Sequence, residues 1–223
     1  MKIPALLLMV ITGCCAKENL QGASFLFSKN SDTSKVVLKP TVTKPLGNMT
    51  VCLETYTDYV HKDSLFKLVK DSKPQFHLFQ TQGYYSIDID KDQVYYKNSD
   101  ETMTWKHICV SWKSSTGVIH FMVNGILYPR RVLKAGFFID SDVSAVLGEN
   151  IVSAVPGFSV GEPSFVGEIR KVNMWDRALP PEEMESMYIT KWKRMRANII
   201  NWESVDYEVY GDVFLYKPWI KPL

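Results

Sequence analysis

The chain has 223 residues, with 26 Lys or Arg against 24 Asp or Glu, so its formal net charge is only +2. This balance argues against nucleic acid as a dedicated partner, because a phosphate backbone selects proteins with clustered positive charge. Beyond the N-terminus, no stretch reaches the roughly 20 apolar residues that a membrane span needs. The composition therefore favours a globular protein that does not cross a membrane.

The N-terminus has the pattern of a secretory signal peptide over residues 1–16. An early lysine precedes the apolar run Ile3–Ile11, and small residues precede a cut after Ala16. A bacterial lipoprotein box ending at Cys14 is the alternative interpretation. Removing residues 1–16 takes away one lysine and leaves 25 basic against 24 acidic residues, a formal charge of +1. We expect residues 17–223 to form one secreted domain of about 207 residues, a size common for single all-β domains.

Short strand-like segments recur along the mature chain and are separated by Gly, Pro, Asn and Asp. In chain order they are Ser24–Phe27, Val36–Leu38, Thr50–Tyr56, Ser64–Val69, Phe76–Gln80, Tyr84–Ile89, Gln93–Tyr96, Lys106–Lys113, Val118–Val123 and Ile126–Tyr128. The dipeptide Asn124-Gly125 between the last two is a strong signal for a two-residue hairpin turn. Many short strands without a long helical period predict an all-β antiparallel sandwich.

Two local signals accompany these strands. Asn48-Met49-Thr50 is an N-glycosylation sequon, so a secreted chain is expected to carry a glycan on Asn48. The segment Pro180–Tyr188 is the candidate helix, because it begins with prolines and has carboxylates in its first turn, as the helix dipole favours.

Two cysteines remain once residues 1–16 are removed. Cys52 lies in one predicted strand and Cys109 in another. Secretion permits their oxidation, and a Cys52–Cys109 disulfide would close a loop of 57 residues. Two free, buried cysteines are the alternative.

The strand around Cys109 makes the chain recognisable. His107-Ile108-Cys109-Val110-Ser111-Trp112 resembles the signature of the pentraxins. The resemblance continues through Thr43–Leu46, Phe165–Ile169, Val172–Asp176, Asn201-Trp202, Tyr207–Val209 and Lys217-Pro218. It covers the whole mature chain and is closest to the short pentraxins. It implies a jelly-roll, lectin-like sandwich with one short helix, the Cys52–Cys109 disulfide and a glycan tolerated at Asn48.

The same resemblance implies a function. Pentraxins are secreted, non-enzymatic recognition proteins of innate immunity and acute-phase responses that assemble as cyclic homopentamers, with complement as a downstream partner. They hold two Ca²⁺ ions on the face opposite the helix, and these ions bridge phosphocholine-like or polyanionic surface ligands. Phe79 matches a family aromatic that packs against the choline methyl groups.

The residues at the family's calcium positions depart from that pattern. Lys73-Pro74 stand where the family has an Asp-Asn pair, which puts an ammonium group in place of a carboxylate. In the ligand loop, Asn150, Ile151 and Val152 fall on the three ligand positions, and Ile151 and Val152 carry no side-chain oxygen. Because Ca²⁺ takes 6–8 oxygen ligands, two intact sites are not expected.

A reduced site is one interpretation of what remains. Asp71, Glu149, Asn150 and Glu162 could hold one weakly bound Ca²⁺, or they could be ordinary loop residues. The alternative function is a pentraxin that has lost its calcium sites and binds a protein or glycan partner without calcium.

A jelly-roll glycosidase is the remote alternative. Asp88, Asp90 and Asp92 alternate along the chain, so their carboxylates would share one face of an extended strand. Paired carboxylates about 5–5.5 Å apart are the apparatus of retaining glycosidases. The family resemblance predicts no enzymatic activity.

Overall fold

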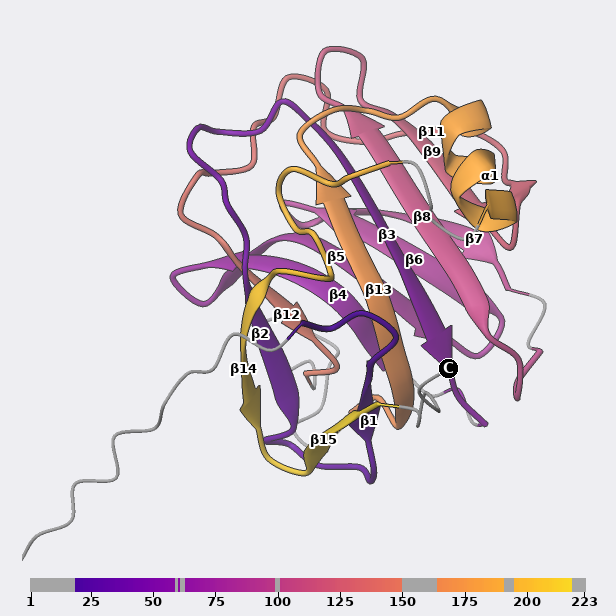
Figure 1. Cartoon of the computed structure of the whole chain (residues 1–223). Helices are drawn as coiled ribbons and strands as arrows, with labels where there is room; N and C mark the ends of the chain where they lie inside the picture. The colour runs from indigo at the N-terminus through magenta and orange to yellow at the C-terminus, as the bar shows by residue number, and fades with distance from the viewer. Residues whose placement is uncertain are drawn as a thin grey trace, which may run out of the picture.

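The fold is a sandwich of two antiparallel β-sheets with a helix, α1, on one outer face (Figure 1). The computed structural model describes residues 19–58, 60, 63–98, 101–149, 164–190 and 195–217. The predicted signal peptide lies outside this range. The predicted fold class is confirmed, and so is the presence of one short helix in the described part of the chain.

The first sheet, called sheet A here, carries the helix. Its strands, in spatial order, are β10 (Ile126–Leu127), β9 (Val118–Val123), β8 (Lys106–Lys113), β3 (Asn48–Tyr56), β13 (Gly167–Trp175), β1 (Ser24–Phe27) and β15 (Val213–Tyr216), and β11 (Arg131–Val132) also pairs with β9.

The second sheet, sheet B, lies behind sheet A in Figure 1. Its strands, in spatial order, are β14 (Asp206–Tyr210), β2 (Lys35–Lys39), β12 (Ser144–Leu147), β4 (Asp63–Lys70), β5 (Lys73–Thr81), β6 (Tyr84–Ile89) and β7 (Asp92–Lys97).

The main core lies between the two sheets, and the alternation of side chains along each strand determines which residues enter it. In β8, Ile108, Val110 and Trp112 enter this core with no exposed surface. The intervening Cys109 points the other way and joins a second cluster beneath α1. Both faces of β8 are therefore buried, one by the opposite sheet and one by the helix.

The strands and the helix predicted from the sequence match the observed ones closely, and the differences lie at the ends of the elements. The hairpin turn is confirmed, because Asn124 and Gly125 both have positive φ, 49° and 79°, as a two-residue turn of this kind requires. A side chain at position 125 would also meet the ring of Tyr188 at 2.9 Å. The helix spans Pro181–Thr190, so it starts one residue later and ends two residues later than predicted.

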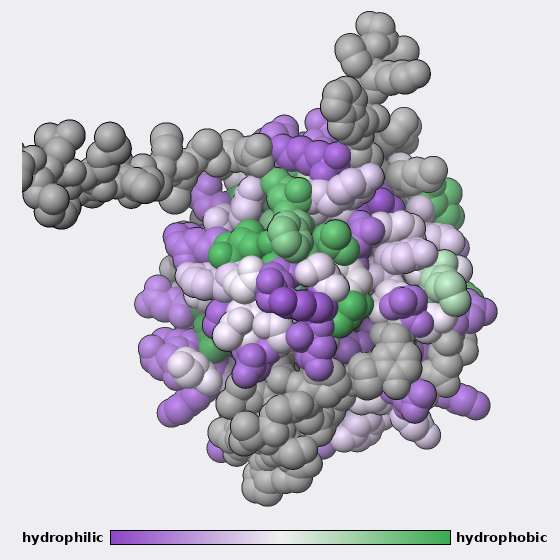
Figure 2. Space-filling model, turned by 90° about the horizontal axis from the view of Figure 1, so that it is seen from below, coloured by the Kyte–Doolittle hydropathy of each residue, from purple (hydrophilic) through white to green (hydrophobic). Residues whose placement is uncertain are grey.

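The two edges of sheet A carry exposed apolar side chains. Ile126 is 68% exposed at the β10 edge, and Phe214 is 57% exposed on β15 at the opposite edge. The end of the molecule at which β1 and β15 lie faces the viewer in Figure 2, where green hydrophobic side chains gather beside purple hydrophilic ones. Exposed apolar groups on edge strands mark surfaces that another chain could cover.

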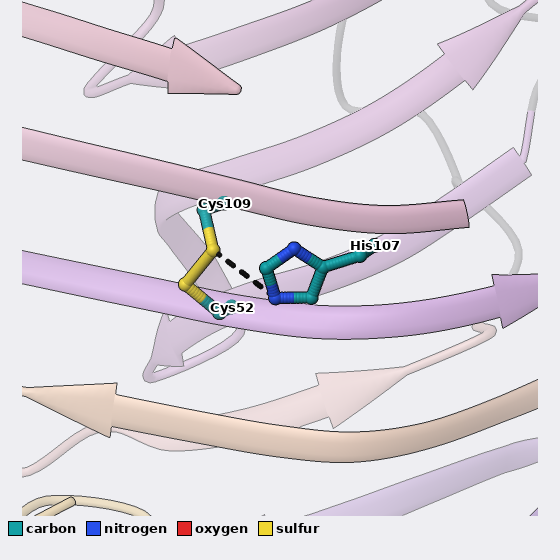
Figure 3. Close-up of side chains that lie close together, drawn as sticks. All are labelled: Cys52, His107 and Cys109. Carbon is teal, nitrogen blue, oxygen red and sulfur yellow. Dashed lines mark hydrogen bonds between the residues drawn. A yellow bond between two sulfur atoms is a disulfide. The ribbon is translucent and has the colours of Figure 1, made fainter. Parts of the chain in front are cut away.

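The predicted disulfide is confirmed. Cys52 and Cys109 face each other directly across the β3–β8 pair and are bonded, with their Cα atoms 4.1 Å apart (Figure 3). The bond lies in the second cluster, under Met184 and Met187 of α1.

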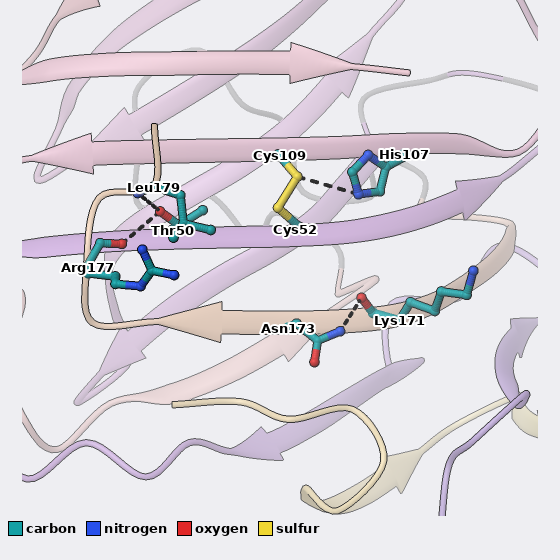
Figure 4. Close-up of a disulfide and its surroundings, with 8 residues drawn as sticks. All are labelled: Thr50, Cys52, His107, Cys109, Lys171, Asn173, Arg177 and Leu179. Atoms are coloured by element: carbon teal, nitrogen blue, oxygen red, sulfur yellow. Dashed lines mark hydrogen bonds between the residues drawn. A yellow bond between two sulfur atoms is a disulfide. The ribbon is translucent and has the colours of Figure 1, made fainter. Parts of the chain in front are cut away.

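The turn that precedes helix α1 is hydrogen-bonded to β3 near the disulfide (Figure 4). The hydroxyl of Thr50, on β3, donates a hydrogen bond to the carbonyl oxygen of Arg177 at 2.8 Å. The hydroxyl oxygen of Thr50 in turn accepts a hydrogen bond from the backbone N–H of Leu179 at 2.9 Å. Thr50 therefore positions the start of the helix relative to the sheet.

Removing the disulfide should lower the free energy of unfolding by about 4 kcal/mol, because the crosslink closes a 57-residue loop in the unfolded chain. The variant is Cys52→Ala with Cys109→Ala, and urea unfolding followed by tryptophan fluorescence measures the loss. Reduced wild-type protein is the control and should unfold at a similar urea concentration. An unchanged midpoint in the double variant would contradict the prediction.

Candidate functional site

The outer face of sheet B is the candidate site. Helix α1 covers part of the outer face of sheet A, so the face opposite the helix belongs to sheet B (Figure 1). Val36 and Leu38 of β2 enter the core, and so Lys35 and Lys39 point outward. Lys67 of β4 also points outward, because its neighbour Leu68 is in the core. This part of the face is rich in lysine.

One carboxylate lies between two of these lysines. Glu149 follows the end of β12, which pairs with β2 on one side and β4 on the other. Its Oε1 lies 2.7 Å from the Nζ of Lys35, and its Oε2 forms an ion pair with Lys67. We call these three residues the lysine–glutamate–lysine cluster.

Gly148 makes this arrangement possible. Its φ is +71°, in the left-handed region where glycine carries no steric cost. A Cβ built at position 148 would lie 2.1 Å from the ring of Phe27. The chain can therefore turn out of β12 close to the core and present Glu149 to the lysines.

The charges of the cluster shift the titration of Glu149. Burial alone would raise the pKa of this carboxyl group, but the ammonium groups of Lys67 and Lys35 outweigh burial and hold the pKa below its ordinary value. Glu149 is therefore ionised at neutral pH, and the two ammonium groups more than balance its negative charge. The cluster as a whole has one positive charge in excess.

A second carboxylate, that of Asp140, contacts Gln75 of β5 and Lys70 of β4. The side-chain amide of Gln75 donates to Asp140 Oδ2 at 2.6 Å, and the backbone N–H of Asp140 donates to Gln75 Oε1 at 2.7 Å. Lys70 Nζ lies 3.4 Å from the same carboxylate. A hydrogen bond from Gln75, together with Lys70, holds the pKa of Asp140 below its usual value.

Of the four predicted calcium remnants, the structure describes Asp71 and Glu149, and it places these two apart. Asp71 lies in the tight turn between β4 and β5, where Asp71 and Ser72 both have positive φ. Lys73 faces Lys70 across this hairpin. Because a strand rises about 3.3 Å per residue, Asp71 is roughly 13 Å along the chain from Lys67, the partner of Glu149. Asp71 and Glu149 therefore belong to different parts of the face.

These described residues do not fit a family-style calcium site. Glu149 is matched by two ammonium groups, and two lysines face each other where the family resemblance calls for an Asp-Asn pair. Ca²⁺ needs several free oxygen ligands. Asn150, Ile151, Val152 and Glu162 lie outside the described residues, so their part in a site stays a prediction.

Phe79 occupies the outer face but is buried. Phe76 and Leu78 enter the core, and so His77 and Phe79 point outward. Only 3% of Phe79 is exposed, and its ring lies 5.0 Å from that of His77. The Nε2 of His77 in turn lies 3.0 Å from the hydroxyl of Ser64. The role of Phe79 as the wall of a ligand pocket stays a prediction.

The alternation of carboxylates proposed for a glycosidase is wrong. Asp88 lies within β6, but Asp90 and Lys91 form the turn to β7, with φ values of 42° and 74°. The carboxylates of Asp90 and Asp92 both approach Lys134, at 3.2 and 3.4 Å. The three carboxylates therefore do not share one strand face.

In the described part of the chain, one group of side chains has three potential metal-ligand atoms within 4.8 Å of one another: Cys52, His107 and Cys109 (Figure 3). Both sulfurs are bonded to each other, and the Nε2 of His107 lies 3.5 Å from Cys109 Sγ. The ring of His107 stacks on Tyr188 of α1, with centroids 5.7 Å apart. This group is a structural junction between sheet and helix.

Asn48 is the first residue of β3 and is partly exposed. Its glycosylation stays a prediction.

The sequence did not predict the partners of these carboxylates, namely Lys35, Lys67, Lys70 and Gln75. Strand alternation would have placed Lys35 and Lys67 on outward positions. What could not be foreseen is that β12 pairs with both β2 and β4.

Comparisons with known proteins agree with this fold. The model of the Pentaxin family matches residues 23–218. The C-reactive protein of Xenopus laevis is 37% identical over 211 residues, which cover 93% of this chain and 88% of that protein. The human serum amyloid P-component is 35% identical over 228 residues, with 100% and 99% covered. The chain therefore belongs to the pentraxin family.

A solved structure shows the same architecture. The heptameric SAP-like pentraxin from Limulus polyphemus superposes with a TM-score of 0.75 at 18% identity, covering 88% of this chain and 95% of that one. Family membership supports a general role in innate-immune recognition rather than enzymatic activity. No helix in the described residues is both long and apolar enough to span a membrane.

Folding stability should fall in acid through His107. Burial lowers the pKa of this imidazole from 6.5 to about 4. Between these two values the unfolded chain binds a proton that the folded protein does not bind. Stability is therefore lost as the pH falls from 6.5 toward 4, by about 3 kcal/mol in total.

Urea unfolding of the wild type and His107→Phe across this pH range measures the effect. The phenyl ring can keep the stack on Tyr188 but cannot titrate, so the variant should lose less stability in acid. His120→Gln is the comparison, because burial also lowers the pKa of this more exposed histidine, and its removal should change the acid dependence less than His107→Phe does. Parallel stability curves for the wild type and His107→Phe would show that His107 does not carry this dependence.

Proposed function

We propose that this chain is a secreted recognition protein that binds phosphocholine-like or other anionic groups on surfaces, through the outer face of sheet B. The observation that carries the proposal is the excess of positive charge around Glu149, where two ammonium groups surround one carboxylate. Lys70 and Lys73 extend the basic surface along the same sheet. The family supports recognition in general terms, and these lysines support the anionic ligand class that the family resemblance implies.

The proposal includes assembly into a closed ring. A ring of identical subunits needs two different, complementary patches on opposite sides of each subunit. Sheet A has exposed apolar residues at both edges, with Ile126 and Val132 at one and Phe214 and Tyr216 at the other. A ring would multiply weak contacts with a repetitive surface. Five subunits and a downstream contact with complement are what the family resemblance implies.

Binding to immobilised phosphoethanolamine tests the ligand class. The protein should be retained on the coated surface and not on the uncoated one, and retention should weaken as salt rises, because the contact is between charges. Surface plasmon resonance measures the affinity, once with calcium and once with a chelator. Absence of binding under both conditions would rule out this ligand class and leave a protein or glycan partner as the alternative.

Assembly is tested separately by Ile126→Asp and Phe214→Asp. A carboxylate at either edge would be buried against a neighbouring subunit without a partner, so each variant should shift the protein from ring to monomer. Tyr84→Asp is the control, because Tyr84 is similarly exposed, at 51%, but lies on sheet B.

Sedimentation velocity reports the size of the assembly. The wild type and Tyr84→Asp should sediment as one large species. A monomeric wild type, or edge variants that sediment like the wild type, would contradict ring assembly through these edges.

A further inference from the structure

The lysine–glutamate–lysine cluster has an unusual composition for a partly buried group. Two cations share one anion, and the side chains of Lys67, Glu149 and Lys35 are only 12%, 22% and 33% exposed. Charges at partly buried positions are screened less by water and salt than fully exposed charges are. The one uncompensated positive charge is therefore felt strongly by any anion that reaches it.

The cluster is also held in place. Its members come from three neighbouring strands, because Lys35 belongs to β2, Lys67 to β4 and Glu149 to the end of β12. The Nζ of Lys35 additionally lies 5.6 Å from the ring centroid of Tyr210, within the range of a cation–π contact. Glu149 thus fixes two flexible side chains before any ligand arrives, which reduces the entropy lost on binding.

Hydrogen-bonding capacity remains after these contacts. An ammonium group has three N–H donors. Within the described part of the chain, the hydrogen-bond acceptor recorded for each ammonium group is Glu149. A tetrahedral anion with several oxygens can accept from both lysines at once, as phosphate does where lysine acts as a point charge.

We infer that the ammonium groups of Lys35 and Lys67 take the place of a bound metal ion, so that this protein binds phosphoryl groups without calcium. The inference rests on the proposed function and specifies its chemistry. The same two lysines explain both properties of the cluster. They neutralise Glu149, so that it does not serve as a calcium ligand, and they leave a positive charge in excess that attracts an anion. Free phosphate and a phosphorylated headgroup share this chemistry.

The first test measures binding to immobilised phosphoethanolamine for the wild type, Lys67→Gln and Lys39→Gln. Lys39 is the matched control, since it points outward from β2 like Lys35 but pairs with Glu208. We expect the wild-type affinity to be the same in calcium and in chelator. Lys67→Gln should weaken it about tenfold or more, the size expected for a hydrogen bond to a charged group. Lys39→Gln should leave it unchanged.

Failure of the inference and failure of the proposed function give different results. Wild-type binding that appears only with calcium would overturn the inference and leave the proposed function standing. Equal binding by Lys67→Gln and the wild type would also overturn the inference. No binding in either buffer would overturn the proposed function and the inference with it.

Glu149→Gln is the second variant, because Lys67→Gln leaves a partly buried carboxylate with one partner fewer and could disturb the fold. Glu149→Gln keeps both lysines and raises the charge of the cluster from +1 to +2. Its side-chain oxygen can still accept hydrogen bonds from the lysines. With the added net positive charge, it should bind phosphoethanolamine at least as tightly as the wild type, whereas a calcium-dependent site would lose a ligand and bind less. Weaker binding by a Glu149→Gln protein with wild-type circular dichroism would overturn the inference.

Competition separates the two sources of the phosphoryl group. Displacement of the protein by inorganic phosphate would show that the phosphoryl oxygens suffice for recognition. Displacement by soluble phosphoethanolamine alone would assign the site to the headgroup. Displacement by neither would overturn the inference.

Discussion

The placement of β12 between β2 and β4 determines the chemistry of the candidate site. This strand has only four residues, yet its hydrogen bonds to both neighbours set which side chains meet at its end. Leu147 pairs with Val36 and Val146 with Lys67, so the next residues emerge between the two lysine-bearing strands. A register shift of one residue in either pair would move a lysine to the other face of the sheet. The ion pairs of Glu149 thus depend on the register of the backbone pairing between β12 and its neighbours β2 and β4.

The two outer faces of the sandwich have different physical roles. On sheet A, the disulfide, Met122 and Trp175 are covered by α1, and the outward residues of β3 and β8 beneath it are buried. On sheet B, no helix in the described part of the chain covers the outward residues, which include the charged side chains of Lys35, Lys67 and Glu149. The covered face stabilises the sandwich, and the charged face carries the proposed binding site.

Much of the fold could be predicted from sequence because its signals are local. The alternation in Lys106–Lys113 and the Asn124-Gly125 turn each follow from neighbouring residues, and the structure confirms both. The pairing of Cys52 with Cys109 followed from the two cysteines left after the predicted signal peptide and from the family resemblance. The alternation of Asp88, Asp90 and Asp92 gave a wrong prediction because it runs through a turn, where positive φ values break the strand geometry.

The lysine cluster could not be predicted in the same way. Lys35, Lys67 and Glu149 are 32 and 82 residues apart along the chain, and no local pattern relates them. The family resemblance of the ligand loop predicts Glu149 as a remnant of a metal site. In the structure, β2 and β4 lie on either side of Glu149. The carboxylate is therefore paired with the cations of Lys35 and Lys67 and is not an open ligand for a metal ion.

Replacing a divalent ion by lysines would change the properties of the interaction as well as its composition. A bound Ca²⁺ concentrates two charges at one point and accepts ligands from many directions, so its occupancy follows the free calcium concentration. Two ammonium groups spread their charge over donors that are fixed to separate strands, and one carboxylate takes up half of it. Each contact is consequently weaker, more directional and more sensitive to salt. Such a site would operate where calcium is low, and a ring of several copies would supply by multivalency the affinity that one cluster lacks.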